Sequence, residues 1–311
     1  SWDAIQFSRV PSRAHKLYRK AFHKHEKERY GAYLEDCKTG KAKIHSTGLQ
    51  PHELVRQFMG GDTGDETIEA QWRALVDNLK SKGKLEHAVA VSDVSGSMEG
   101  TPMEVSIALG ILVSQLSAEP FRGRLITFST KPEWHKVPID QSLRDMVRSV
   151  KDMEWGGSTN MHKVFKLILD VAIEAKLPQE ALPKTLFVFT DMQFNMAAGD
   201  SSLTVMEHAR QEYSAKGYTV PQVVFWNLRA SSTRAFPVAT DEAGVAMLSG
   251  FSSELLKMFM CGRVLTPHDL MMKAVGHYEV EIPEVDMQDP KEEKKGEGGS
   301  EADSKADDGG K

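Results

Sequence analysis

The chain has 311 residues and 40% hydrophobic content, which suffices for one large domain with an attachment or for two domains. The net charge is −5, and the charges are unevenly distributed along the chain. Residues 1–43 carry 11 Lys and Arg against 5 Asp and Glu, whereas residues 279–311 carry 5 Lys against 12 Asp and Glu. This distribution favours a basic interaction face and an acidic, solvated tail. The chain has two cysteines, Cys37 and Cys261, which are too few for a disulfide framework or a four-cysteine zinc site. This low number predicts an intracellular protein, with the cytoplasm as the favoured location and the nucleus as the alternative.

Residues 1–84 have a helical pattern. Gln50-Pro51-His52-Glu53-Leu54 predicts a helix start with Pro at the first helical position. A later apolar stripe at helical spacing predicts a second helix, which Gly83 is placed to end. The stripe consists of Ile68, Trp72, Leu75, Val76 and Leu79.

From residue 85 onward, apolar strands alternate with helices. Strands are expected at 85–92, 121–129, 134–137 (a short edge strand), 186–190, 222–227 and within 236–248, and helices at 101–116, 142–153, 161–176, 207–216, 252–260 and after Thr266. Thr101-Pro102-Met103-Glu104 has the pattern of a capping box. We therefore predict an α/β fold: a doubly wound, mostly parallel sheet flanked by helices, spanning 85–282, with an N-terminal helical attachment (1–84) and a disordered acidic tail (283–311).

Three loops of this fold carry oxygen-bearing side chains. Asp93, Ser95 and Ser97 follow the first strand, Thr159 lies in a Gly-rich loop before a helix, and Asp191 ends the apolar strand 186–190. If these strands are neighbours, all five side chains meet at the carboxyl edge of the sheet, where α/β folds bind ligands. Two carboxylates and three hydroxyls suit a hard cation, Mg²⁺ first and Mn²⁺ or Ca²⁺ as alternatives, and argue against zinc or copper.

The order Asp93-x-Ser95-x-Ser97, Thr159, Thr190-Asp191 resembles the metal-ion-dependent adhesion site (MIDAS) of von Willebrand factor A domains, over roughly residues 85–262. The resemblance implies that Ser95, Ser97 and Thr159 bind the ion directly. It also implies that Asp93 and Asp191 act mainly through water, and that an acidic residue of a protein partner completes the coordination.

A narrower resemblance involves the N-terminal segment. Arg9-Val-Pro-Ser12 and Leu49-Gln-Pro-His-Glu-Leu54 resemble the TROVE module of the Ro autoantigen. They resemble even more closely a group of uncharacterised TROVE-like proteins of plants and fungi. Thr190-Asp-Met-Gln-Phe194 and residues 241–250 also fit this group. The resemblance implies an alternative function in binding small RNAs. The basic run 9–29, with Tyr18, Phe22 and Tyr30 as candidate stacking groups, is compatible with it, although packed aromatic residues are the favoured interpretation.

Catalytic sets are not visible in the sequence. No Ser-His-Asp or Cys-His arrangement can be assembled, no Gly-x-x-x-x-Gly-Lys-Ser/Thr loop occurs, and Ser95 stands where an Asp-nucleophile phosphatase would need a carboxylate. His135, His162 and His208 have no visible partners. We therefore expect a non-enzyme, with Mg²⁺-assisted hydrolysis as a third hypothesis that lacks a nucleophile.

The sequence thus predicts an intracellular, Mg²⁺-dependent module that binds a protein partner through the carboxylate of that partner. RNA binding remains the alternative. No membrane partner is expected, because no apolar run reaches the roughly 18 residues that a span requires.

Overall fold

The structure, a computed structural model, describes residues 2–60, 65–153, 160–191, 205–229, 244–251, 256 and 272. The predicted tail 283–311 and the predicted helices at 252–260 and after Thr266 lie outside these residues, apart from single positions. Among the described residues, no helix is both long and apolar enough to cross a membrane.

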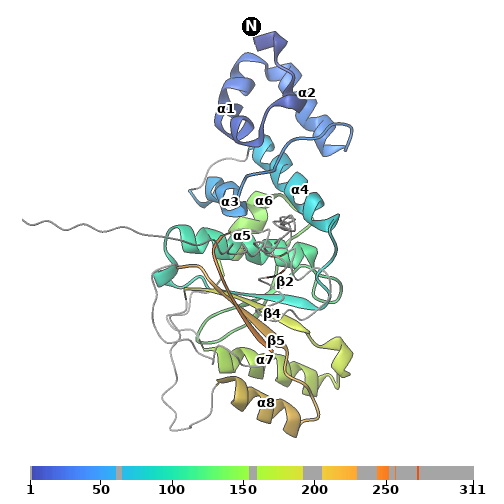
Figure 1. Cartoon of the computed structure of the whole chain (residues 1–311), viewed down its shortest axis with the longest axis vertical. Coiled ribbons are helices and arrows are strands. Elements are labelled where there is room, and N and C mark those ends of the chain that lie inside the picture. The colour runs from blue at the N-terminus through green and yellow to red at the C-terminus, as the bar shows by residue number, and fades with distance from the viewer. Residues whose placement is uncertain are drawn as a thin grey trace, which may run out of the picture.

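A six-stranded sheet forms the centre of the molecule, with the order β3-β2-β1-β4-β5-β6 (Figure 1). All neighbouring pairs are parallel except β2 and β3. The strands are β1 (Ala88–Ser92), β2 (Arg124–Thr127), β3 (Trp134–Lys136), β4 (Thr185–Thr190), β5 (Gln222–Asn227) and β6 (Val245–Ser249). The predicted α/β class, the mostly parallel sheet and the edge strand at 134–137 are confirmed.

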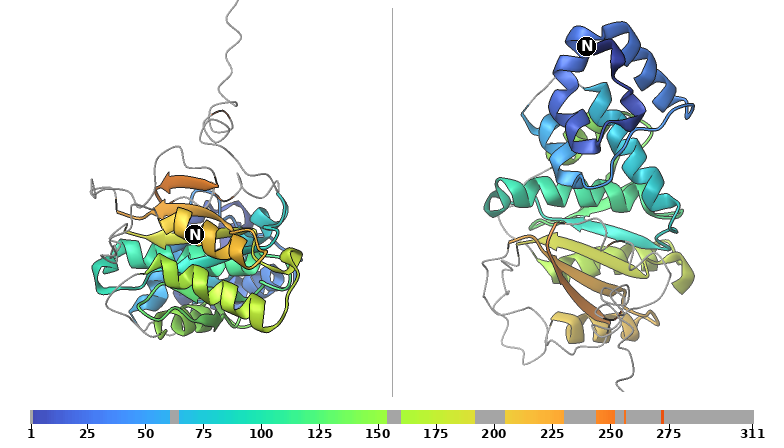
Figure 2. Two further views of the ribbon diagram at one scale, coloured as in Figure 1. Left: turned by 90° about the horizontal axis from the view of Figure 1, so that it is seen from below. Right: turned by 45° about the horizontal axis from the view of Figure 1, so that its top comes forward.

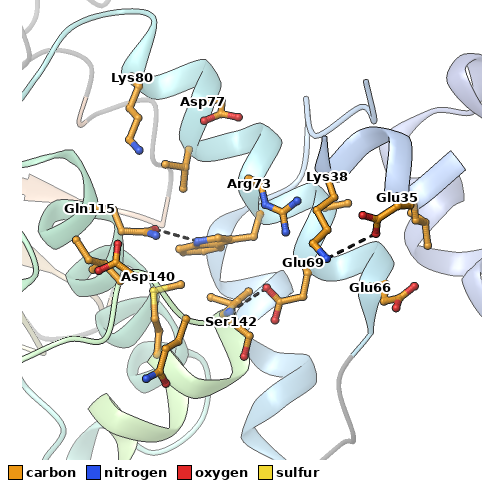
Figure 3. A pocket seen from close by; sticks show the side chains of 18 residues that line it. Glu35, Lys38, Glu66, Glu69, Arg73, Asp77, Lys80, Gln115, Asp140 and Ser142 are labelled. Atoms are coloured by element: carbon orange, nitrogen blue, oxygen red, sulfur yellow. Dashed lines mark hydrogen bonds and ion pairs between the residues drawn. The ribbon is translucent and has the colours of Figure 1, made fainter. Parts of the chain in front are cut away.

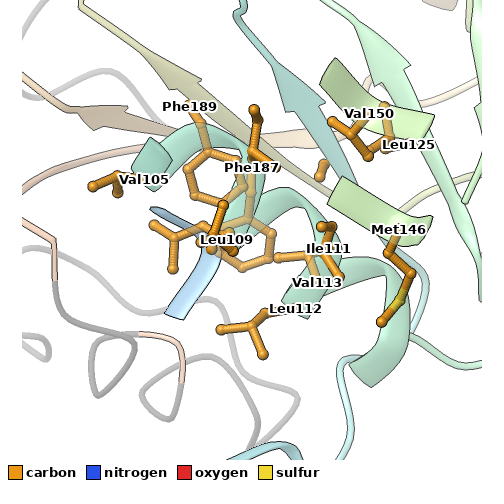
Figure 4. Close-up of a cluster of buried hydrophobic side chains, with 14 of the residues drawn as sticks. Val105, Leu109, Ile111, Leu112, Val113, Leu125, Met146, Val150, Phe187 and Phe189 are labelled. Carbon is orange, nitrogen blue, oxygen red and sulfur yellow. The ribbon is translucent and has the colours of Figure 1, made fainter. Parts of the chain in front are cut away.

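Helices cover both faces of the sheet (Figure 1). One face packs on α5 (Thr101–Leu116) and α6 (Leu143–Lys151), and the other on α7 (Met161–Glu174) and α8 (Val205–Ala215). Because successive strand residues point to opposite faces, β4 sends Phe187 and Phe189 toward α5 (Figure 4) and Leu186 and Val188 toward α7 and α8. The run of four apolar residues in β4, 186–189, is explained by this double coverage.

The N-terminal helices lie outside α5, with α3 and α4 beside α6 (Figures 1 and 2). They are α1 (Ser12–His25), α2 (Lys27–Lys38), α3 (Pro51–Met59) and α4 (Glu66–Lys80), preceded by short 3₁₀ turns at Trp2–Ala4 and Phe7–Arg9. The predicted stripe from Ile68 to Leu79 is buried and joins the same apolar cluster as α5 and the sheet. Helices α1 and α2 enclose a separate small cluster around Phe7, Phe22 and Tyr30.

The predicted capping box at Thr101–Glu104 is wrong. Thr101 is the first residue of α5, the cap position is Gly100 with φ 90°, and no side chain caps this end. Arg56 of α3 engages the two residues instead: its guanidinium contacts Glu104 at 2.7–2.9 Å and Thr101 Oγ1 at 3.2 Å. A capping box does form at the start of α3, between Gln50 and Glu53.

Strand β1 begins three residues later than predicted. His87 has φ 50°, in the left-handed region, which interrupts the extended backbone ahead of Ala88. Leu85 makes only an isolated bridge to Ser117, at the end of α5. The remaining predicted elements within the described residues agree with the structure to within a few residues at their ends.

Candidate metal site at the switch point of the sheet

The strand order reverses between β1 and β4, which lie side by side in the sheet from Ala88↔Thr185 to Ser92↔Phe189. In doubly wound folds the loops on the two sides of this switch point diverge and leave a crevice beyond the carboxyl ends of the strands. The loop after β1 begins with Asp93, and β4 is followed directly by Asp191. The topology thus brings these two predicted residues to the same edge.

Hydrogen bonds hold the Asp93 carboxylate from two directions. Its Oδ1 accepts the backbone N–H of Ser95 at 2.9 Å, and its Oδ2 accepts the hydroxyl of Thr190 at 2.9 Å. The backbone N–H of Asp93 donates to Phe189 at 3.0 Å, which extends the β1–β4 ladder by one residue. Asp93 is fully buried, so its carboxylate is held between its own loop and the end of β4 and is not exposed to solvent.

The two serines of the loop present their hydroxyls to each other. Ser95 Oγ and Ser97 Oγ are 3.1 Å apart, with Ser95 nearly buried and Ser97 half-buried. A short 3₁₀ turn over Gly96–Met98 brings them together, and Gly100, at positive φ, then turns the chain into α5. This turn places two hydroxyl oxygens near a buried carboxylate.

The charges at this edge come from three strand ends. Asp191 is fully buried, and the guanidinium of Arg229, two residues after β5, lies 3.7 Å from its Oδ2. Burial raises the pKa of Asp93; the hydrogen bonds from Ser95 and Thr190 oppose this effect, and the negative charge of Asp191 adds to it. A cation bound between the two carboxylates would reverse this penalty on the charged form of Asp93.

The structure brings four of the five predicted residues to one edge: Asp93, Ser95, Ser97 and Asp191. Thr159 lies outside the described residues; the next residue, Asn160, caps α7 by accepting the backbone N–H of Lys163 at 3.1 Å. Sequence reasoning missed Arg229 and the contact between Thr190 and Asp93. The position of Arg229 just after the strand 222–227 was the available signal, because it places that residue at the same carboxyl edge.

A cavity of about 560 Å³ lies elsewhere, between the N-terminal helices and α5 and α6 (Figure 3). Charges of both signs line it, including Lys38, Arg73 and Asp77. One wall is structural: Glu69 accepts the backbone N–H groups of Leu143 and Arg144 at 2.9 and 3.2 Å, which caps α6. This cavity contains none of the predicted ligands.

The fold and the edge geometry together define a doubly wound α/β domain with an oxygen-rich polar site at its switch point. The chain belongs to the family described as domain of unknown function DUF7788, whose model matches residues 87–300. Residues 1–85 match the model of a second family, domain of unknown function DUF2828.

The chain is 40% identical over 290 residues to "Uncharacterized protein L728" of Acanthamoeba polyphaga mimivirus, an alignment that covers 89% of this chain and 50% of that protein. The chain thus spans half the length of this curated relative.

Two solved structures are similar in part. The Ro (RSR) protein of Deinococcus radiodurans has a TM-score of 0.44 at 15% identity, covering 70% of this chain and 45% of that one. Proximal thread matrix protein 1 of the mussel byssus has a TM-score of 0.37 at 16% identity, covering 57% and 47%. Neither TM-score is high enough to indicate a shared function.

Proposed function

We propose that this protein is a divalent-cation-dependent, non-catalytic binding module. Mg²⁺ would bind at the switch point through Asp93, Ser95, Ser97, Thr159 and Asp191, with Mn²⁺ or Ca²⁺ as substitutes, and would take a carboxylate from a protein partner. The observation that supports this most strongly is the pair of serine hydroxyls, 3.1 Å apart, on a loop whose Asp93 carboxylate is buried beside Asp191.

The ligand types fit a hard cation. Carboxylate and hydroxyl oxygens are what Mg²⁺ prefers, and no His, Cys or Met is among the predicted ligands to favour a softer metal. Hydroxyl ligands are neutral, so the ion keeps much of its charge and attracts a further carboxylate. When bound, the ion would supply only this electrostatic attraction, while the chain's own residues orient the site and hold it in place.

Mg²⁺ titration by isothermal calorimetry tests the site. We expect Asp93→Ala to weaken Mg²⁺ binding at least roughly 100-fold, since loss of even an outer partner of a metal site costs 10–100-fold. Asp170→Ala is the matched control, because this aspartate is exposed on α7 and pairs with Lys166 one turn away. Equal affinity in the wild type and Asp93→Ala would refute the metal site.

Arg229 offers a second test of the same site. Its guanidinium lies 3.7 Å from Asp191 and would compete electrostatically with a cation there. We expect Arg229→Gln to bind Mg²⁺ several-fold more tightly than the wild type, and the difference to shrink at high salt. Weaker binding by Arg229→Gln would mean that Arg229 organises the site rather than opposing the ion.

The partner is tested by pull-down from an extract with and without chelator. We expect a protein captured in Mg²⁺ to be released by the chelator, recaptured when Mg²⁺ is restored, and absent with Ser97→Ala. Capture that ignores the chelator would refute metal-dependent recognition while leaving the metal site itself intact.

RNA binding is a second candidate, supported by the exposed face of α1. Arg13, Leu17, Lys20 and Lys24 recur at helical spacing and are exposed. Two of the three candidate stacking residues do not support RNA binding, because Phe22 and Tyr30 are buried in the N-terminal cluster. Packed aromatic residues were the favoured interpretation, although Phe22 and Tyr30 pack in this cluster and not on the α/β domain. Only Tyr18 of the three is exposed, at 52%.

A triple variant, Arg13→Ala with Lys20→Ala and Lys24→Ala, tests this candidate. If α1 binds small RNAs, affinity should fall steeply with salt, and the triple variant should lose both affinity and about three units of the salt slope. No binding by the wild type at low salt would eliminate the candidate.

A further inference from the structure

A second group of metal-type ligands lies between α7 and α8, the helices on the face of the sheet opposite to α5. His162 is in the first turn of α7, whereas His208 and Glu212 are four residues apart on α8 and so share one face of that helix. One ligand atom from each residue lies within 4.8 Å of the other two. The three side chains come from helices that lie side by side in Figure 1 and pack against each other.

The contacts within this cluster converge on one carboxylate oxygen. His162 Nε2 lies 3.8 Å and His208 Nδ1 lies 3.9 Å from the same atom, Glu212 Oε1. The two imidazole rings meet edge to face, with centroids 4.7 Å apart and planes at 82°. All three side chains are half-buried, so the cluster is both organised and accessible.

These separations are too long for hydrogen bonds, which require about 2.7–3.2 Å between nitrogen and oxygen. The Nδ1 atom of His208 is itself buried, and within the described part of the chain it has no hydrogen-bond partner. A buried imidazole nitrogen without a partner is costly unless something else satisfies it. The space between the three ligand atoms is where such a group would fit.

We propose that His162, His208 and Glu212 form a Zn²⁺ site, distinct from the switch-point site and independent of the proposed function. Two imidazole nitrogens and one carboxylate oxygen are a ligand set that Zn²⁺ accepts and that Mg²⁺ does not favour. Three protein ligands leave the fourth tetrahedral position for water or an outside ligand.

The geometry allows the ion with small movements. Ligand bonds of about 2.0–2.2 Å at tetrahedral angles place ligand atoms roughly 3.4 Å apart. The two contacts to Glu212, at 3.8 and 3.9 Å, therefore need to shorten by about half an ångström, and the two imidazole nitrogens, which lie within 4.8 Å of each other, by at most about 1.4 Å. Half-buried side chains on helix surfaces can make such shifts by small changes in their side-chain torsions.

Zinc at this position would fix the first turn of α7 relative to α8, because the three ligands come from these two helices.

Zinc titration against a chromophoric chelator, in saturating Mg²⁺, tests the proposal. We expect one Zn²⁺ per wild-type chain, and at least roughly 100-fold weaker binding in His208→Ala and in His162→Ala. His25→Ala on α1 and Glu174→Gln at the end of α7 are matched controls that should bind like the wild type. Far-UV circular dichroism shows that each variant is folded, and Co²⁺ in place of Zn²⁺ should give the absorption spectrum of a tetrahedral site.

Asp93→Ala separates the two metal sites. It should retain zinc with unchanged affinity, whereas it should lose Mg²⁺. Absence of zinc binding by the wild type, retention of zinc by folded His208→Ala, or loss of zinc in Asp93→Ala would each overturn the proposal.

Discussion

The two faces of the sheet are covered by helices of very different character. Helix α5 is buried all the way round from Val105 to Ser114, and this stretch contains no charged residue. Helix α7 is amphipathic, with Lys163 and Lys166 on its outer side. An all-round apolar helix needs a second layer to cover it, and in this protein α3 and α4 supply that layer.

This difference shows what the N-terminal segment contributes. The cluster of buried apolar side chains that includes α5 and the sheet continues through Leu54, Phe58, Trp72 and Leu79. On the opposite face, α7 and α8 meet the solvent directly and leave polar side chains, including the His/Glu cluster, accessible. One face is therefore covered by a second layer of helices, whereas the helices on the other face meet the solvent.

Deletion of residues 1–84 should have the largest effect. It removes nine buried apolar residues from the shared cluster and exposes the apolar side of α5 that they cover. We expect the truncated chain to aggregate or to lack a cooperative thermal transition. The control is deletion of residues 1–43, which keeps α3 and α4. If the chain without residues 1–84 unfolded as cooperatively as the wild type, α5 would not need this cover.

The next prediction concerns Gly110, where helix α5 approaches strand β1 closely. Gly110 of α5 lies directly over Ser92 of β1, and a Cβ added at Gly110 would collide with Ser92 Oγ. Gly110→Ala should therefore lower the free energy of unfolding by about 1–3 kcal/mol, despite the better helix propensity of Ala.

Ser92→Ala should suppress this effect. It removes the colliding oxygen, which is buried and has no hydrogen-bond partner in the described part of the chain, and leaves the Ser92 Cβ at 3.7 Å, an ordinary contact. The double variant should be at least as stable as Ser92→Ala alone in chemical denaturation. If the losses of unfolding free energy caused by Gly110→Ala and Ser92→Ala were additive, Gly110 of α5 would not lie over Ser92 of β1.

Much of the covered face could be predicted from the sequence, because uniform burial gives strong patterns. Residues 186–189 form a short apolar run of the kind found in strands buried on both faces, and the stripe from Ile68 to Leu79 has helical spacing. The loop of Asp93, Ser95 and Ser97 was visible for a different reason: its spacing is local, so no tertiary information is needed to bring its oxygens together.

Features that depend on which elements become neighbours were not predictable in the same way. Thr101 and Glu104 contact Arg56 and do not form a capping box with each other, because α3 packs across the start of α5. Likewise, the proximity of His162 to His208 follows from the packing of α7 against α8, which no local pattern in the sequence encodes.

The polar edge between the two faces gives a pH-dependent prediction. Because burial raises the pKa of Asp93, the folded state binds a proton there more tightly than the unfolded state. Its contribution to stability is therefore complete below the unfolded pKa, near 4, and is lost as the pH rises through the folded value.

Without metal, Asp93→Asn should thus be more stable than the wild type at neutral pH, by about 1.4 kcal/mol for each pH unit between the folded and unfolded pKa values of Asp93. The two proteins should converge near pH 4. Denaturant titrations in chelator across this pH range measure the difference, and Mg²⁺ should restore only the wild type. Identical pH profiles would show that Asp93 is not penalised by burial.

The smallest expected effect concerns the ion pair that links α3 to α5. Arg56 of α3 forms a multiply bonded ion pair with Glu104 of α5, which raises the pKa of Arg56. The Arg56 side chain is 48% exposed, so solvent screens much of the attraction. A double-mutant cycle with Arg56→Ala and Glu104→Ala should give a coupling of about 0.5–1 kcal/mol that decreases with salt. Lys38–Glu35, exposed on α2 and within one helix, is the control pair and should couple less. A coupling well above that range would mean that this ion pair, and not the apolar cluster alone, determines how α3 sits on α5.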